Sequence, residues 1–247
     1  MDKVESSDLA RALARMSAVL LSQENVATTV QLVTTLAVTT LPGTAGAGVS
    51  LMDTVDKRST AASDPLVEQA DLLQYELDEG PCLTAWRDRV PVRIDDTDAE
   101  SRWPRWTKAV AADGIRAVLS TPMLVADRSI GAIKVYSRQP SSYDDHGAEV
   151  LTLLAKQAAI LLANAQSFED AQELTTQLKS ALVSRDLVGQ AKGVLIAGGA
   201  RDEATAFAML TTASQRSNVK VHEVARRLVA DTADGRGVRR DRPRTRA

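Results

Sequence analysis

The sequence predicts an α+β domain followed by a small helical module, and three observations carry this prediction. Apolar residues recur at helical spacing over residues 8–21 and 24–41, up to Pro42-Gly43. Short runs of strand character then occupy much of the chain as far as residue 136. A long helical pattern begins at Leu151. Helices, then strands with helical insertions, then a long helix are typical of a sheet covered mainly on one side.

Alternation and turn residues position the strands. Residues 48–52 alternate between the two faces of a strand, and residues 59–63 are expected to pair with them as a hairpin. A helix is expected over residues 104–112, closed by Asp113-Gly114. Further strand-like runs cover residues 90–94, 117–119, 122–125 and 130–136.

The helix that begins near Leu151 is expected to join the two parts of the chain. Its apolar positions step by three and four, which is the rhythm of a coiled coil. We therefore expect a homodimer through this helix, with a seam from Leu151 to Phe168. The alternative is one helix that packs first on its own sheet and then on the C-terminal module. The stepping positions are Leu154, Ala158, Leu161, Ala165 and Phe168.

Residues 178–229 have the pattern of three short amphipathic helices. Gly198-Gly199 end the first, because glycine accepts the left-handed conformation that closes a helix. Asp202 is a good N-cap for the second, whose Phe207 and Leu210 are expected in the core. The cationic and amide side chains outside the apolar stripes are Arg185, Gln190, Lys192, Gln215, Arg216 and Lys220.

Charge is unevenly distributed along the chain. The 247 residues carry 30 Lys and Arg against 32 Asp and Glu, a net of -2, which argues against nonspecific coating of nucleic acid. From Glu169 onward there are 14 basic and 10 acidic residues, a net of +4, whereas residues 1–168 have a net of -6. An acidic sensor joined to a basic nucleic-acid reader fits this distribution. Glycine, proline and six arginines within residues 233–247 predict a disordered basic tail.

Few residues offer the chemistry of a catalytic or metal site. The sequence has no metal-ligand cluster, Gly-rich phosphate loop or Ser/His/Asp grouping, so we expect no metal, no cofactor and no enzyme activity. Cys82 is a candidate redox switch or chromophore anchor, or alternatively a small buried hydrophobe. Trp103 and Trp106 either line a ligand cavity or pack as core.

The location of the protein is predicted from what the sequence lacks. A single cysteine excludes an internal disulfide framework. The N-terminus has no apolar signal region, and no uninterrupted apolar run reaches 18 residues. We therefore expect a cytoplasmic protein without membrane contact.

The C-terminal residues resemble the ANTAR family, whose members are RNA-binding antiterminators that grip paired small stem-loops in a leader transcript. The resemblance implies RNA contact by Arg185, Gln190, Lys192, Gln215, Arg216 and Lys220, with Ala191 and Gly193 allowing close approach. Thr211 and His222 stand where the family commonly has basic residues. The matching strings are RDLVGQAKGVL over residues 185–195, Ala206-Phe207, Ser214-Gln215, Asn218, Lys220 and Val224-Ala225.

The first part resembles the GAF domains that accompany ANTAR modules in actinobacteria. The matching strings are DEGPC over residues 78–82, Arg102-Trp103-Pro104, GIRAVLSTP over residues 114–122 and GAIKVY over residues 131–136. A GAF domain implies an antiparallel sheet with flanking helices and a sensing role. Its signal, a small molecule or a protein, is not identified by the resemblance.

Four segments follow from these features: a GAF-like sensor over residues 1–165, a helical linker over 166–177, a three-helix ANTAR bundle over 178–232 and the tail over 233–247. The expected function is that of a dimeric antitermination regulator that binds stem-loops in leader RNA. Base stacking on aromatic rings is not expected, because Phe207 is assigned to the core. Alternatives are a sensor that acts through protein contact with weak or lost RNA binding, and a DNA-binding regulator.

Overall fold

The computed structural model describes residues 3–19, 25–52 and 57–233. The chain divides into two compact units, Met1–Asp170 and Ala171–Ala247. The predicted tail lies, beyond Ala233, outside the described residues.

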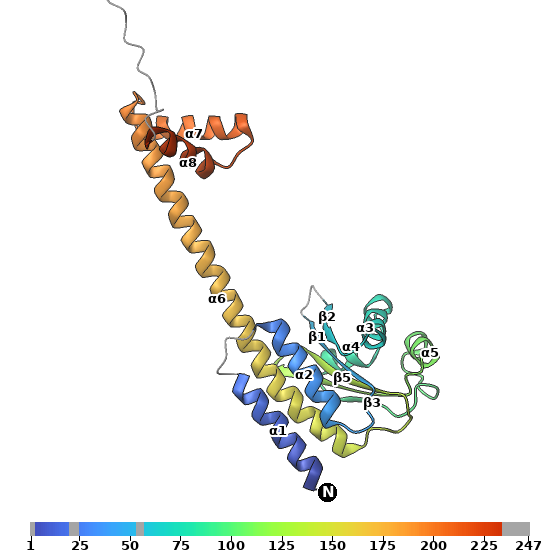
Figure 1. The fold of residues 1–247 in the computed structure, drawn as a ribbon. Coiled ribbons are helices and arrows are strands. Elements are labelled where there is room, and N and C mark those ends of the chain that lie inside the picture. The colour runs from blue at the N-terminus through green and yellow to red at the C-terminus, as the bar shows by residue number, and fades with distance from the viewer. Residues whose placement is uncertain (1–2, 20–24, 53–56, 234–247) are drawn as a thin grey trace, which may run out of the picture. The chain divides into compact units, whose positions relative to one another are not determined.

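A five-stranded antiparallel sheet organises the first unit (Figure 1), with the strand order β2-β1-β5-β4-β3. The expected hairpin is present, and Gly48 lies opposite Ala62. The runs predicted at 117–119 and 122–125 form one strand. Pro122 is tolerated there because pairing with β3 ends at Ser120. The strands are β1 (Gly46–Met52), β2 (Lys57–Ala62), β3 (Val92–Ile94), β4 (Ala117–Val125) and β5 (Arg128–Ser137).

Helices cover both faces of this sheet, so the expectation of cover mainly on one side is wrong. One face packs against α1 (Lys3–Val19), α2 (Val26–Thr40) and the start of α6 (Asp145–Ala197). The other face packs against α3 (Pro65–Leu77), α4 (Pro81–Asp88) and α5 (Pro104–Ala112). The first seven residues of β4 are all buried, which requires a layer on each face because alternate side chains point to opposite sides.

The layer beyond the hairpin contains a helix that was not expected. The α3 helix begins where the Asp64 carboxylate accepts hydrogen bonds from the N–H groups of Leu66 and Val67, at 2.9 and 3.1 Å. Pro65 occupies its first turn. The α5 helix, in contrast, has the predicted bounds, and Gly114 follows it with a φ of +84°.

The α6 helix extends over 53 residues, and its first part belongs to the core of the sensor unit. Leu151, Leu154 and Ala158 are buried against α1, α2 and the sheet, and Leu161 is only 3% exposed. The dimer seam expected from Leu151 to Phe168 is therefore wrong, and the alternative of packing within the chain holds for this stretch.

One window of 18 residues in α6 has a mean hydropathy of 1.3, apolar enough by composition to span a membrane. Half of that window is buried inside the protein. A core helix of a folded domain has the same composition, and the packing of Leu151 and Leu154 identifies this window as such a helix.

The second unit is a small bundle formed by the end of α6, α7 (Glu203–Ser217) and α8 (Val221–Ala233). The breaks occur as predicted. α6 ends at Ala197, before Gly198-Gly199, and Asp202 accepts a hydrogen bond from the Thr205 N–H at 2.8 Å. The buried residues of this bundle are Ala191, Ala206, Leu210 and Ala225.

Candidate nucleic-acid interface

The core of the bundle decides which of the expected RNA contacts face outward. Ala191 is fully buried against residues of α7 and α8, so its expected role at the RNA surface is wrong. Phe207 was expected in the core, yet it is 48% exposed, and Ala206 and Leu210 fill the core instead. One residue turns a side chain by about 100° around a helix. Phe207 therefore lies beside the buried stripe and not within it.

One face of α6 carries Arg185, Gly189, Lys192 and Gly193, because steps of three and four return to the same side of a helix. Arg185 is exposed, and so is the neighbouring Gln190. A Cβ atom added at Gly189 or Gly193 would meet nothing within 4 Å. Helix packing within the chain therefore does not explain Gly193, and the space beside both glycines is open.

Lys192 connects this face to α7. Its Nζ lies 2.7 Å from Oε2 of Glu203, in the first turn of α7. The hydrogen bond from Lys192 holds the pKa of Glu203 below its usual value. Phe207 follows Glu203 by four residues and so shares its side of α7. We call Arg185, Gly189, Lys192, Gly193, Glu203 and Phe207 the α6–α7 surface.

A second group of expected contacts lies at the other end of α7. Gln215, Arg216 and Lys220 are exposed around the turn at Asn218, whose φ is +52°. The 15 residues of α7 span about 22 Å, at 1.5 Å per residue. Figure 1 shows this turn at the end of α7 remote from α6. The expected contacts therefore form two groups about a helix length apart.

The α8 helix adds two cations that the sequence prediction omitted. Arg226 and Arg227 are exposed, and both pair with Glu223, at 2.6 and 3.7 Å. The hydrogen bond from Arg226 lowers the pKa of Glu223. A pair of arginines outside an amphipathic stripe was the signal available in the sequence.

The sensor unit contains a buried ion pair between the sheet and α3. Nζ of Lys134, on β5, lies 2.6 Å from Oδ2 of Asp71, on α3, and neither side chain is exposed. Lys134 also donates a hydrogen bond to Ser50, and the Tyr136 hydroxyl donates to Asp71 at 2.9 Å. Burial opposes the charge on Lys134, but Asp71, together with Cys82 and Tyr75, outweighs this effect, and the pKa of Lys134 is raised. The space between β5 and α3 is therefore occupied by a buried ion pair of the protein itself.

The three candidate ligand residues of the sensor are packed as core. Cys82 is completely buried, and burial raises the pKa of its thiol, so the reactive thiolate is scarce at neutral pH. Trp106 is buried as well, and its Nε1–H donates to the Ala70 carbonyl at 2.9 Å. Trp103 is almost fully buried. None of the three lines the pocket at the start of α6 or the one beside α5.

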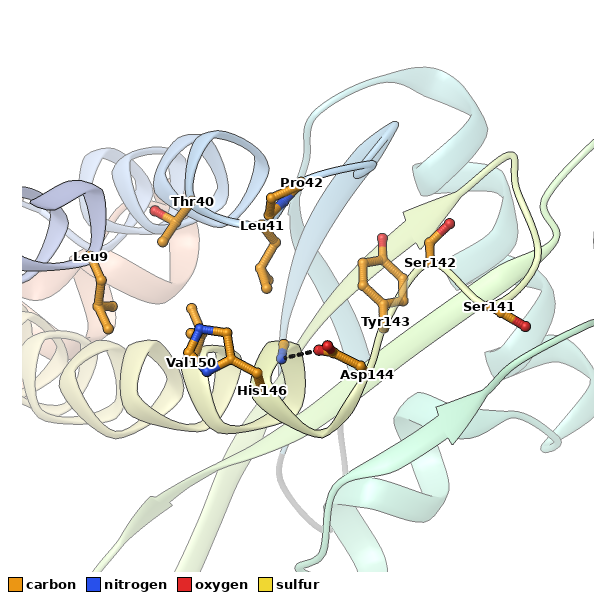
Figure 2. Close-up of a pocket in the computed structure, with 11 residues that line it drawn as sticks. Leu9, Thr40, Leu41, Pro42, Ser141, Ser142, Tyr143, Asp144, His146 and Val150 are labelled. Carbon is orange, nitrogen blue, oxygen red and sulfur yellow. Dashed lines mark hydrogen bonds between the residues drawn. The ribbon is translucent and has the colours of Figure 1, made fainter. Parts of the chain in front are cut away.

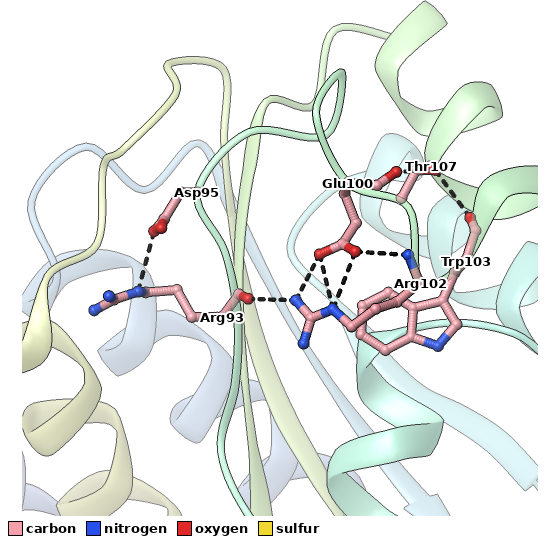
Figure 3. A network of polar contacts seen from close by, with 6 residues as sticks. All are labelled: Arg93, Asp95, Glu100, Arg102, Trp103 and Thr107. Atoms are coloured by element: carbon pink, nitrogen blue, oxygen red, sulfur yellow. Dashed lines mark hydrogen bonds and ion pairs between the residues drawn. The ribbon is translucent and has the colours of Figure 1, made fainter.

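A polar network fixes the loop before α5 (Figure 3). The Arg102 guanidinium donates to the Glu100 carboxylate at 3.0 Å and to the Arg93 carbonyl at 2.8 Å. It also lies over the Trp103 ring, 4.5 Å from the centroid. The hydrogen bonds from Arg102 lower the pKa of Glu100. The Arg102-Trp103-Pro104 string is therefore a structural clamp between β3 and α5.

Comparison with protein families gives two consecutive matches. The GAF domain family matches residues 23–163, more than half of the chain, and the ANTAR domain family matches residues 176–229. The protein belongs to the GAF family. Its second unit carries an ANTAR domain, so a GAF sensor domain precedes an RNA-binding domain, as the resemblance predicted.

Solved structures of similar fold support the GAF assignment, and their low identity limits the similarity to the fold. The free methionine-R-sulfoxide reductase from Neisseria meningitidis has 18% identity and a TM-score of 0.53, with 68% of this chain and 95% of that chain covered. The GAF domain of an Acinetobacter phosphoenolpyruvate-protein phosphotransferase has 13% identity and a TM-score of 0.52, with coverage of 69% and 99%. Comparison with curated proteins gives no match.

Proposed function

We propose that this GAF-ANTAR protein is a cytoplasmic transcription antitermination regulator and not an enzyme. Its ANTAR unit binds stem-loops in leader RNA, and its GAF unit responds to a small-molecule or protein signal. The observation that carries the proposal is the ANTAR match over residues 176–229, on a helical unit whose cations lie outside its core.

The α6–α7 surface suits an unpaired RNA base next to a phosphate. Phe207 is the one aromatic residue after Phe168 in the sequence, and its ring is half exposed. An exposed ring can stack a base while the Lys192 ammonium meets the RNA backbone. Gly189 and Gly193 leave room for that backbone. Phe207 therefore gives base stacking a role that the sequence pattern did not suggest.

A second copy of the chain is proposed to bind along residues 174–183 of α6. Leu174, Leu178 and Leu182 lie on successive turns, Val183 follows Leu182, and each of the four is between 56 and 60% exposed. A row of large apolar side chains on one helix is typical of an interaction surface. Leu174, Leu178 and Ala181 keep steps of four and three, as in a coiled coil. Such a dimer carries two ANTAR units, which matches a pair of stem-loops.

RNA binding is tested with the full-length protein. An RNA with two adjacent stem-loops is first selected from a library with randomised loops. Three labelled probes are then compared: this paired probe, one of its stem-loops alone, and duplex DNA of equal length. We expect preference for RNA and tighter binding of the paired probe. The logarithm of the affinity should fall with that of the salt concentration, by about 0.7 for each single-stranded phosphate contact. Equal affinity for RNA and DNA, or none for either, contradicts the proposal.

The second candidate function is a sensor that acts through protein contact. It is favoured by the Lys192–Glu203 ion pair, which occupies one of the expected RNA-binding cations, and by the neutral Thr211 on α7. Capture from a cell lysate with the full chain separates the two functions, because this candidate predicts a bound protein and no enriched RNA.

A further inference from the structure

A cavity of about 450 Å³ lies beside the first turns of α6, within the sensor unit. Figure 2 shows Leu9 of α1, Leu41 after α2 and Val150 of α6 around it. Small-molecule sites commonly have volumes of roughly 300 to 1,000 Å³. The apolar part of the wall is therefore built by three separate elements around a space that a small ligand can fill.

The polar part of the wall includes side chains that can still form hydrogen bonds with a ligand. Asp144 caps α6, since its Oδ1 accepts a hydrogen bond from the Gly147 N–H at 2.8 Å. Asp144 and His146 are both exposed, and the second carboxylate oxygen of Asp144 and the ring nitrogens of His146 make no hydrogen bond to any described residue. The Tyr143 hydroxyl, in contrast, is hydrogen-bonded to Thr44 at 3.2 Å. Among the titratable groups of the wall, the unused hydrogen-bonding capacity therefore lies at the start of α6.

The charge of the wall selects the ligand. Among the described residues that line the cavity, Asp144 is the only one with a permanent charge at neutral pH, and none is a lysine or an arginine. Arg93, outside the lining, is held by Asp145 at 2.7 Å and by Asp95 at 3.0 Å. A ligand carboxylate would face Asp144 without a cation to balance it. A ligand ammonium would gain the free oxygen of Asp144 as a charged hydrogen-bond acceptor.

We propose that this cavity is the signal site of the GAF unit and that it binds an amphipathic amine, with an apolar body about the size of an aromatic ring system and an ammonium group directed at Asp144. The inference rests on the sensing role proposed above. It also suggests how a signal reaches the second unit. The helix that supplies His146, Gly147 and Val150 to the cavity supplies Ala191 and Leu195 to the core of the ANTAR bundle.

The test titrates full-length protein, without RNA, with tryptamine, the neutral tryptophol and the anionic indole-3-propionate by calorimetry. Tryptamine should bind most tightly and indole-3-propionate most weakly. Asp144→Asn keeps a good helix cap and removes the charge, so it should weaken tryptamine binding about tenfold, the scale of one charged hydrogen bond, and leave tryptophol binding unchanged.

Two further variants complete the test. Glu149→Gln removes an exposed charge on α6 outside the lining, and tryptamine binding should be unchanged. Thr40→Phe adds a ring to the wall and should abolish binding of all three compounds. Equal binding of the amine and the acid, an Asp144→Asn variant that binds like wild type, or no tryptamine binding at all would overturn the proposal. Because no RNA is present, these results are independent of the antitermination proposal.

Discussion

The two units of this protein differ in how far they bury their large apolar side chains. The sensor unit buries large residues on both faces of its sheet, among them Trp106, Leu119 and Leu154. The ANTAR unit fully buries three alanines and a leucine among its described residues, and it leaves Leu178, Phe207 and other large side chains half exposed.

This difference indicates which unit is complete by itself. The sensor has an extensive buried interior, and its exposed large apolar side chains are few: Leu72, Val90 and, two turns apart on α6, Leu153 and Ile160. The second unit has a small core and a row of exposed leucines, so its stability and function are expected to depend on what covers it. In our proposal RNA covers the α6–α7 surface, and a second copy covers residues 174–183.

The largest effect is expected from a matched pair of substitutions on α6. Leu161→Glu places a charge in the sensor core and should destabilise that unit by about 4 kcal/mol or more, because the charge has no partner. Leu178→Glu, at a position 57% exposed, should leave the fold intact and turn a dimer into a monomer. Thermal unfolding and sedimentation measure the two outcomes. A Leu161→Glu variant that melts like wild type would contradict the burial of Leu161 in the sensor core. A wild-type protein that is already a monomer would contradict the proposed dimer.

The buried ion pair should give the next largest effect. Lys134→Met leaves the Asp71 carboxylate without its cation and should cost about 3 to 5 kcal/mol of stability in urea unfolding. The double variant Lys134→Met/Asp71→Asn removes both charges and should recover part of that loss. If the single and double variants had equal free energies of unfolding, the unpaired Asp71 carboxylate would not be the cause of the lost stability.

Lys192→Ala should weaken RNA binding by about 1 to 3 kcal/mol, the scale of a charged contact. Its stability should change little, because the pair with Glu203 is partly exposed to solvent. Lys156→Ala, at an exposed position of α6 in the sensor unit and outside both proposed surfaces, is the matched control. Equal RNA affinities of the two variants would remove Lys192 from the interface.

Phe207→Ala separates the two assignments of this ring. A core phenylalanine would cost about 3 to 5 kcal/mol of stability, whereas a half-exposed one should cost much less. Loss of a stacked base should instead weaken RNA binding by about 1 to 3 kcal/mol, and Phe207→Tyr should restore it. A variant that unfolds the bundle, or one that binds RNA like wild type, contradicts the stacking role.

The smallest effect concerns pH. Hydrogen bonds from Thr205 lower the pKa of Asp202, so the cap stabilises α7 above the unfolded pKa of about 3.9 and loses this contribution as the pH falls through the lower folded value. Thermal unfolding between pH 5 and pH 2 should show this loss in wild type. Asp202→Asn keeps the helix cap but has no titrating group, so this variant should not show the loss of stability at low pH.

Local signals in the sequence predicted most of the elements. The hairpin, α5 and the breaks at Gly198-Gly199 and Asp202 follow from turn and cap chemistry, which acts over a few residues. The start signal of α3 at Asp64-Pro65 is equally local, although no helix was predicted there.

The remaining features depend on which distant residues meet. The stripe from Leu151 to Phe168 has the same spacing whether it packs on its own sheet or on another chain, so periodicity could not decide between them. Phe207 and Leu210 both read as core, and only the angle at which α7 packs exposes the ring. Lys134 occurs in a predicted strand, and its burial depends on Asp71, which is contributed by the unexpected helix α3.

The Lys134–Asp71 pair also restricts how this sequence can diverge. Each charge is compensated inside the protein by the other, so a mutation at either position alone is expected to destabilise the sensor unit. A lineage that loses the pair must change both positions almost together or acquire compensating stability beforehand. Among descendants of this protein the two residues should therefore be inherited as a unit, whatever happens at the more tolerant surface of the ANTAR unit.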